Sequence, residues 1–279
     1  MKEFYTRSLT AIAYATVLLF SLFINEYFFY FVGFVCSLIL VFEFIKLIAN
    51  YNHKFLSSDT GKSNLILYLT FPLYISLFLL SYNWVFQLFF LIIIIITNIL
   101  LGVSLLKKKL FSFSILKNRF IGHFYLVGSL VILFSMPTIS EIYNPNYVFC
   151  FLSLIWVSDS AAYVFGVNFG KRPLLKSVSP KKSIEGFIGG IIFSIMLSII
   201  FYNYLNLGFS IVQWVILGLL VPSAGALGDL VQSQFKREAG VKDSGNWLPG
   251  HGGLYDRMDS IIFAGPFIYL TIKIFLNVS

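Results

Sequence analysis

Long apolar runs, each about as long as a membrane-spanning helix, dominate this sequence. A helix needs about 20 predominantly apolar residues to cross the hydrocarbon core of a bilayer. Hydrophobic residues make up 58% of the 279 residues and charged residues only 11%, which excludes an ordinary soluble domain. The sequence predicts an all-α, polytopic integral membrane protein with about nine transmembrane helices, at residues 8–25, 27–49, 64–81, 84–106, 120–136, 146–168, 184–204, 209–231 and 255–277.

The loops between these runs alternate in charge. Lys and Arg occur at the N-terminus and after the second, fourth, sixth and eighth runs, whereas the intervening turns contain neither. Positive loops normally face the cytoplasm, so the pattern predicts a cytoplasmic N-terminus in the cell inner membrane or an equivalent one. It places 170–183 and 232–254 on the cytoplasmic side. We therefore interpret the formal charge of +8 as a sign of orientation, not of nucleic-acid binding.

One membrane domain, residues 1–279, accounts for the whole sequence, because no repeat or long linker divides it. We expect 1–136 to supply mainly scaffold spans and 146–279 to supply the catalytic spans and cytoplasmic loops. Glu43 and Lys46 interrupt the early apolar runs, at a spacing that predicts a pair on one helix face.

Five acidic residues lie in or at the ends of the later runs, where an ionisable side chain costs about 2.5–3.5 kcal/mol on insertion scales and usually faces a partner or a cavity. They are Asp159, Glu185, Asp229, Asp256 and Asp259. Asp229 is followed at helical spacing by Ser233, Lys236 and Arg237, so these four share one face of a continuous helix. An ion pair within that helix at the membrane edge is the alternative.

Asp256 and Asp259 stand three residues apart and can converge with Asp229 from a neighbouring helix. Such a set of hard oxygen ligands suits Mg²⁺ and leaves room for a second cation, whereas the ligands that zinc prefers are absent. A closed cluster neutralised by Arg257 is the alternative.

Two loop motifs add candidate anion sites. In "SVSPKKSIEG", Ser179 and Pro180 are typical of a helix start, and a helix N-terminus beside Lys181 and Lys182 would attract an anion. These lysines are equally explained by membrane orientation. In "PGHGG", glycines around His251 allow a close backbone approach to a ligand. "TGKS" at 60–63 lacks the upstream glycine of a phosphate-binding loop and is rejected.

The polar segment as a whole carries a longer pattern. Ser233-x-Phe-Lys-Arg237, Lys242-Asp243-x-Gly245 and Leu248-Pro-x-His-Gly-Gly-Leu-x-Asp-Arg-Met-Asp259 closely resemble the signature of the phosphatidate cytidylyltransferase (CDP-diacylglycerol synthase) family. "SDSAAY" and "SPKKSIEG" resemble its upstream motifs, with Ser160 and Ser183 where Thr is more usual. The motif resemblance covers about residues 156–260.

This resemblance implies a Mg²⁺-dependent reaction of CTP with phosphatidate in a membrane enzyme that is a homodimer. It implies metal ligation by Asp229 and Asp256, and places Ser233, Lys236 and Asp243 in a polar cavity. We add Asp259 as a third candidate ligand. Arg237 and His251 join the candidate catalytic residues, and the candidate substrate-binding residues are Asp159, Lys181, Lys182, Lys242 and Arg257.

Two alternatives stay open. A CTP-dependent enzyme acting on another lipid, such as a polyprenol-type kinase or a CDP-archaeol synthase, would need much the same site. A cation transporter would also carry acids in several spans, although lysines and a glycine-rich loop suit a phosphate better than a cation.

Overall fold

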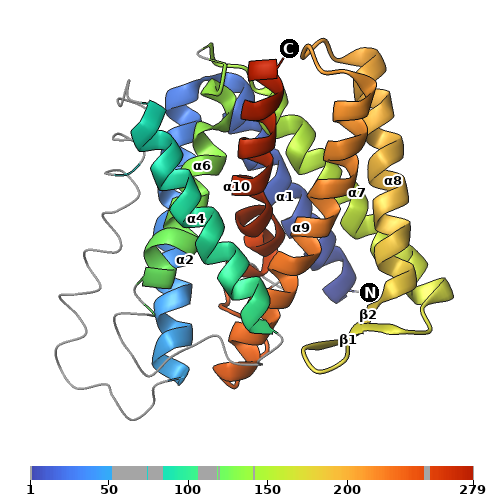
Figure 1. Cartoon of the computed structure of the whole chain (residues 1–279). Coiled ribbons are helices and arrows are strands. Elements are labelled where there is room, and N and C mark those ends of the chain that lie inside the picture. Colours follow the sequence, from blue (N-terminus) through green and yellow to red (C-terminus); the bar gives the residue numbers. More distant parts are fainter. Residues whose placement is uncertain are drawn as a thin grey trace.

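The described part of the chain is a bundle of long helices with a short hairpin at one end (Figure 1). This computed structural model describes residues 2–51, 74, 84–105, 118, 120–140, 142–247 and 252–278. Most of the predicted span 64–81, the "TGKS" sequence and His251 lie outside the described residues.

The helices follow the apolar runs. They are α1 (Lys2–Ile24), α2 (Glu26–Tyr51), α4 (Trp84–Ser104), η2 (Gly122–Gly128), α6 (Ser129–Ser135), η3 (Met136–Thr138), α7 (Asn146–Phe169), α8 (Ile184–Tyr204), α9 (Ile211–Glu238) and α10 (Tyr255–Val278). Within the described part, six helices are long and apolar enough to cross a membrane: α2, α4, α7, α8, α9 and α10. The chain is thus an all-α integral membrane protein, while the total of nine spans stays a prediction.

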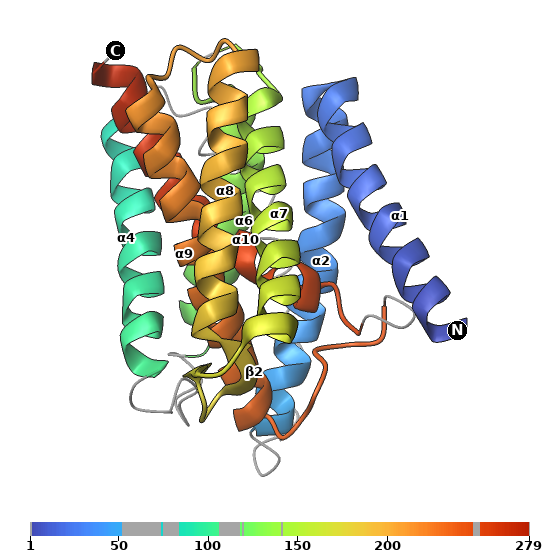
Figure 2. The same ribbon diagram turned by 90° about the vertical axis from the view of Figure 1, so that its right-hand side faces the viewer.

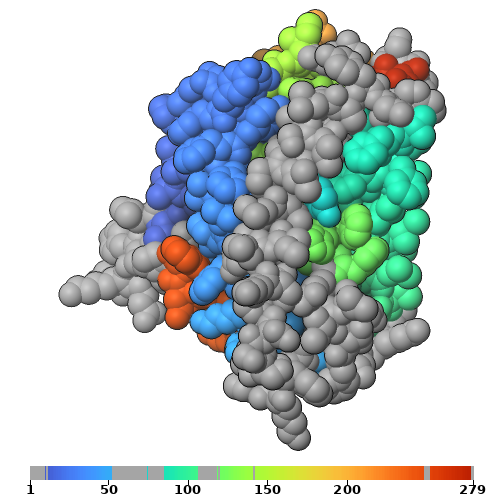
Figure 3. Space-filling model, turned by 90° about the vertical axis from the view of Figure 1, so that its left-hand side faces the viewer, coloured from blue at the N-terminus to red at the C-terminus, as the bar shows by residue number. Residues whose placement is uncertain are grey.

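Large apolar side chains cover the outer faces of these helices. On α1, α2 and α4, Phe20, Tyr27, Phe31, Phe89 and Leu100 are all exposed. Figure 3 shows a side of the molecule on which parts of these helices form the surface. Such a surface would be unfavourable in water, whereas in a bilayer it contacts lipid chains.

Helix α10 runs through the middle of the bundle and is the most buried of the six long helices (Figures 1 and 2). Two glycines let neighbouring helices approach closely. A Cβ atom at Gly186 of α8 would lie 2.6 Å from the Ala162 carbonyl oxygen of α7, and one at Gly228 of α9 would lie 2.6 Å from the Asp259 carbonyl oxygen of α10. A third close approach, at Gly218 of α9 against Ile195 of α8, joins the two pairs, so the acidic positions of α7, α9 and α10 come to one region.

A two-stranded antiparallel hairpin, β1 (Pro173–Leu175) and β2 (Ser179–Ser183), precedes α8. The prediction of a helix start at Ser179 and Pro180 was therefore wrong. Ser183 is the N-cap, because its Oγ accepts the Gly186 N–H at 3.1 Å. Glu185, in the first turn of α8, holds the base of the hairpin by accepting from the backbone N–H groups of Lys171 and Arg172 and from the Arg172 side chain.

Candidate active site

A cavity of about 1010 Å³ opens among α1, α7, β2, α8, α9 and α10. Charged side chains from four of these elements line it: Asp159 of α7, Lys181 and Lys182 of β2, Asp229 and Lys236 of α9, and Asp256, Arg257 and Asp259 of α10, together with Asp243 of the loop after α9. Its wall also contains apolar side chains, among them Ile12, Trp156, Val167, Leu174 and Phe187. The cavity therefore presents both a charged and an apolar surface to one ligand.

One group of acids in the cavity is centred on Asp229. The Lys182 ammonium forms an ion pair with this carboxylate, and the Ser233 hydroxyl donates to Asp229 Oδ1 at 3.2 Å. Asp159 and Asp259 line the same cavity, close enough to Asp229 and Lys182 for electrostatic interaction. The side chains of Asp229 and Lys182 are 31% and 32% exposed, so a ligand that enters the cavity can reach both.

The other group is centred on Asp256, in the first turn of α10. Oδ1 accepts from Lys236 Nζ at 2.6 Å and from Gln232 Nε2 at 2.7 Å, both on α9. Oδ2 faces the loop and accepts from the N–H groups of Ser244 and Gly253, each at 2.9 Å. Only 6% of the Asp256 side chain is exposed, so its orientation is fixed far more firmly than that of Asp229.

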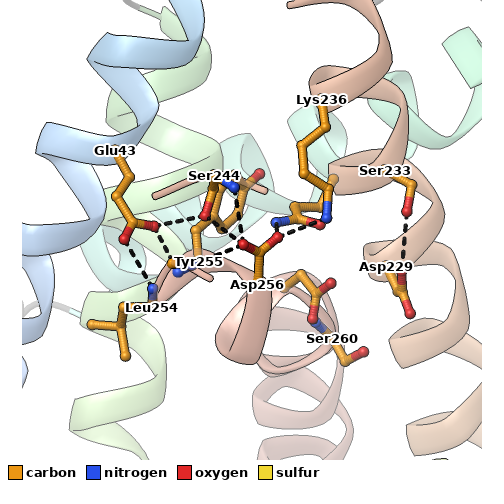
Figure 4. A network of polar contacts seen from close by, with 12 residues as sticks. Glu43, Asp229, Ser233, Lys236, Ser244, Leu254, Tyr255, Asp256 and Ser260 are labelled. Carbon is orange, nitrogen blue, oxygen red and sulfur yellow. Dashed lines mark hydrogen bonds and ion pairs between the residues drawn. The ribbon is translucent and has the colours of Figure 1, made fainter. Parts of the chain in front are cut away.

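Figure 4 shows the two groups separated along α9, with Ser233 and Asp229 on one side and Lys236 and Asp256 on the other. Lys236 forms its ion pair with Asp256 of α10. The alternative hypothesis, an ion pair within α9, is therefore wrong for Lys236. Asp259 Oδ1 accepts from the Ser260 N–H at 2.7 Å.

Several predicted residues lie elsewhere. Arg237 and Lys242 are exposed and lie outside the described lining of the cavity. Ser233 is also outside the described lining, and its hydroxyl reaches the site by donating to Asp229. His251 lies outside the described residues, so its candidate role stays a prediction.

Sequence reasoning missed three residues at the site. Glu43 of α2 accepts hydrogen bonds from the loop before α10 and from the start of that helix, and not from Lys46 as its spacing predicted. Gln232 and Ser244 both contact Asp256. A lone carboxylate in the apolar run of α2 was a usable signal for Glu43, whereas nothing in the sequence distinguished Ser244.

The donor chemistry of the site fits a hard divalent cation, although the described residues contain no ready-made cluster of three or more His, Cys, Asp or Glu ligands. Gln232 Oε1 is buried beside Asp256 and has no hydrogen-bond partner among the described residues. A carboxylate next to an unsatisfied amide oxygen is the kind of ligand pair that Mg²⁺ accepts, with phosphate oxygens and waters completing the shell.

These features define a helical membrane protein whose charged cavity is suited to phosphate-bearing ligands. The sequence profile of the cytidylyltransferase family matches residues 5–275, and the chain belongs to this family.

Proteins named phosphatidate cytidylyltransferase are among its relatives. The one from Bacillus subtilis (strain 168) is 44% identical over 133 residues, which are 48% of this chain and 49% of that protein. The one from Staphylococcus saprophyticus is 35% identical over 191 residues, 67% of this chain and 70% of that protein. The one from Staphylococcus aureus (strain COL) is 37% identical over 183 residues, 63% of this chain and 66% of that protein. The aligned part thus spans about half of the first relative and about two thirds of the other two.

Proposed function

We propose that this protein is a phosphatidate cytidylyltransferase, which converts CTP and phosphatidate to CDP-diacylglycerol and pyrophosphate. The observation that carries the proposal is a single cavity with carboxylates and lysines in one part of its wall and apolar side chains in another. A nucleotide triphosphate needs the charged part, and a lipid phosphate needs both. The names of the relatives support the same reaction.

In this reaction a phosphate oxygen of phosphatidate attacks the α-phosphorus of CTP. A new P–O bond forms there, the bond to the β-phosphate oxygen breaks, and pyrophosphate leaves with the electron pair. The attacking oxygen is already anionic at neutral pH, so little general-base help is needed. The main demand is to bring two polyanions together and to stabilise the charge that develops.

Basic residues in the cavity meet this demand. We assign Lys182 and Lys236 to the substrate phosphates, because both line the cavity and lie beside the carboxylates of Asp229 and Asp256. Lys181 and Arg257, which are exposed on the cavity wall, extend the positive surface. Asp159, Asp243 and Asp259 line the same cavity, where they would orient these cations or bind the nucleotide through its hydroxyl and amino groups.

We further propose that Mg²⁺ is held by Asp229 and Asp256, with the buried Gln232 amide oxygen beside the second of them. Mg²⁺ would neutralise phosphate charge and align the two substrates. Because Lys182 and Lys236 pair with these two carboxylates in the structure, each lysine would move from its carboxylate toward a phosphate when cation and substrate bind. Asp259 is the third candidate ligand, and a second cation is compatible with this number of acids.

We propose that the cavity faces the cytoplasm, where CTP is available. The hairpin and the loop after α9 lie at the same end of the bundle (Figure 1). Both segments contain some of the basic residues from which the orientation was predicted. A homodimer stays a prediction of the family resemblance.

The test is CTP-dependent formation of CDP-diacylglycerol by the purified protein in mixed micelles of phosphatidate, with Mg²⁺ and with excess EDTA. We expect product only with Mg²⁺ and with unsubstituted protein, and none with Asp256→Asn. Consumption of CTP with a polyprenol or an archaeol-type lipid, but not with phosphatidate, would overturn the assigned acceptor. No consumption of CTP with any of these lipids, from a folded preparation, would favour the cation transporter.

A further inference from the structure

Glu43 is a buried carboxylate on a helix that contributes no residue to the described lining of the cavity. Glu43 is 1% exposed and lies in the second half of the apolar helix α2. A charge at such a position costs about 2.5–3.5 kcal/mol on insertion scales and is retained where it makes specific contacts. Among the described residues, its hydrogen bonds go to the segment that carries Asp256.

The first contacts are with the start of α10. Glu43 Oε1 accepts the Leu254 N–H and Oε2 accepts the Tyr255 N–H, each at 2.9 Å. The first N–H groups of a helix have no partner within the helix and carry the positive end of its dipole. Glu43 thus caps α10 from another helix, immediately before Asp256.

The second contact joins Glu43 to Asp256 through Ser244. The Ser244 hydroxyl lies 2.8 Å from Glu43 Oε2 and 3.0 Å from Asp256 Oδ2, and the Ser244 N–H donates to the same Asp256 oxygen (Figure 4). Ser244 is 3% exposed, so water does not compete for these contacts. The loop, the helix start and Asp256 are therefore held against one fixed carboxylate.

Two glycines of the polar segment make room for this carboxylate. A Cβ atom at Gly245 would lie 2.5 Å from Glu43 Oε1, and one at Gly253 would overlap both Glu43 and the Ser244 hydroxyl. Sequence reasoning attributed the glycines near His251 to ligand approach. At Gly253 the space is taken by Glu43.

We propose that Glu43 is the positioning residue of the reaction, which orients Asp256 by capping α10 and by holding Ser244. The inference rests on the proposed function, since Asp256 must ligate the cation for its orientation to matter. Glu43 acts through Asp256, and its loss changes how tightly the site binds metal as well as how fast the site turns over.

The test compares Glu43→Gln with the unsubstituted protein. Gln keeps the size of the side chain but places an NH₂ group where one oxygen accepts hydrogen bonds, so one of the α10 or Ser244 contacts is lost. We expect the Mg²⁺ concentration for half-maximal activity to rise about tenfold or more, as for groups that orient a metal ligand. The KM for phosphatidate should stay within about twofold, because Glu43 does not line the cavity.

A second readout does not depend on turnover. The rise of the thermal midpoint with increasing Mg²⁺ should require about tenfold more cation in Glu43→Gln. A residue that only stabilises the fold would lower the midpoint without metal and leave the Mg²⁺ dependence of both readouts unchanged. That result would overturn the proposal.

Ser244→Ala is the milder variant, because it removes the bridge and leaves the caps of α10 in place. It should shift the Mg²⁺ dependence in the same direction by a smaller factor. The shift in the double variant should be smaller than the product of the two single shifts, since both act on Asp256. Independent effects, or no shift in Ser244→Ala, would contradict the proposed connection.

Glu26→Gln is the matched control, since it removes a carboxylate from the first turn of the same helix. It should leave both readouts unchanged. If the unsubstituted protein forms no product with Mg²⁺, the proposed function fails. If the unsubstituted protein is active and Glu43→Gln behaves like Glu26→Gln, the role of Glu43 fails instead.

Discussion

The two carboxylates proposed to bind metal lie at the same cavity but in different surroundings. Asp256 is 6% exposed and accepts from Lys236, Gln232, Ser244 and Gly253. Asp229 is 31% exposed, and it contacts Lys182 and Ser233. One carboxylate is thus part of the packed structure and the other is nearly free to exchange its partner. We expect both to be needed for activity, and only Asp256 to be needed for stability as well.

The largest effect is expected for Asp256→Asn. Turnover should fall by about 10³-fold or more, because a proposed metal ligand and the orientation of Lys236 are lost together. The substitution also leaves the Lys236 ammonium buried without its counter-charge, at a cost of about 3 kcal/mol. Steady-state kinetics and the thermal midpoint in detergent measure the two losses. An unchanged midpoint would mean that the Asp256 network does not stabilise the fold.

Asp229→Asn should reduce turnover by about 10²–10³-fold, with a change in stability below about 1 kcal/mol, because its ion pair is partly exposed. The same two measurements apply. Full activity in this variant would refute its role as a metal ligand, and a midpoint as low as that of Asp256→Asn would remove the distinction between the two carboxylates.

Lys182→Ala is expected to lower kcat/KM for CTP by about tenfold to a hundredfold, since an ammonium that faces substrate phosphates is lost while the fold keeps its other contacts. Lys176→Ala, at the turn of the same hairpin and outside the described lining of the cavity, serves as control. Equal losses in both variants would indicate a general effect of hairpin charge and not a contact made by Lys182.

The smallest effect is expected for Arg237→Ala. This side chain is exposed and lies outside the described cavity lining, so its charge acts on the substrate only at long range and through solvent. We expect kcat/KM for CTP to fall by about threefold or less, and the effect to shrink as salt is added. Lys236→Ala, at the adjacent position, is the comparison, and its kcat/KM should fall far more. A comparable loss in both would show that Arg237 reaches the substrate.

The sequence was informative about the helices because the membrane imposes a simple requirement on composition. Apolar runs predicted α7, α8 and α10 to within a few residues. Helix α9 continues to Glu238, beyond the predicted end at 231, because hydropathy marks the edge of the apolar region and not the last helical hydrogen bond. The hairpin was missed because its strands are short and carry no alternating pattern.

The acids of the site could also be predicted, since charges in apolar runs are rare and Asp229, Asp256 and Asp259 all line the cavity. Their partners could not be. Lys182 lies in a hairpin 47 positions before Asp229, and only the packing of α7, α8 and α9 brings the two together. Glu43 was assigned a neighbour on its own helix because local spacing says nothing about contacts between distant segments.

The cap that Glu43 places on α10 joins segments 211 positions apart in the chain. At a synthesis rate of about 5–20 residues per second, α2 waits roughly 10–40 s for its partner to be made. During that interval Glu43 lies in the membrane without the N–H groups that later donate to it. Its side chain must then be protonated, or must contact water or the insertion machinery. The order in which the helices are made therefore leaves the active site as one of the last parts of the molecule to form, and a chain that stops before residue 254 lacks the partners of a charge already placed in the bilayer.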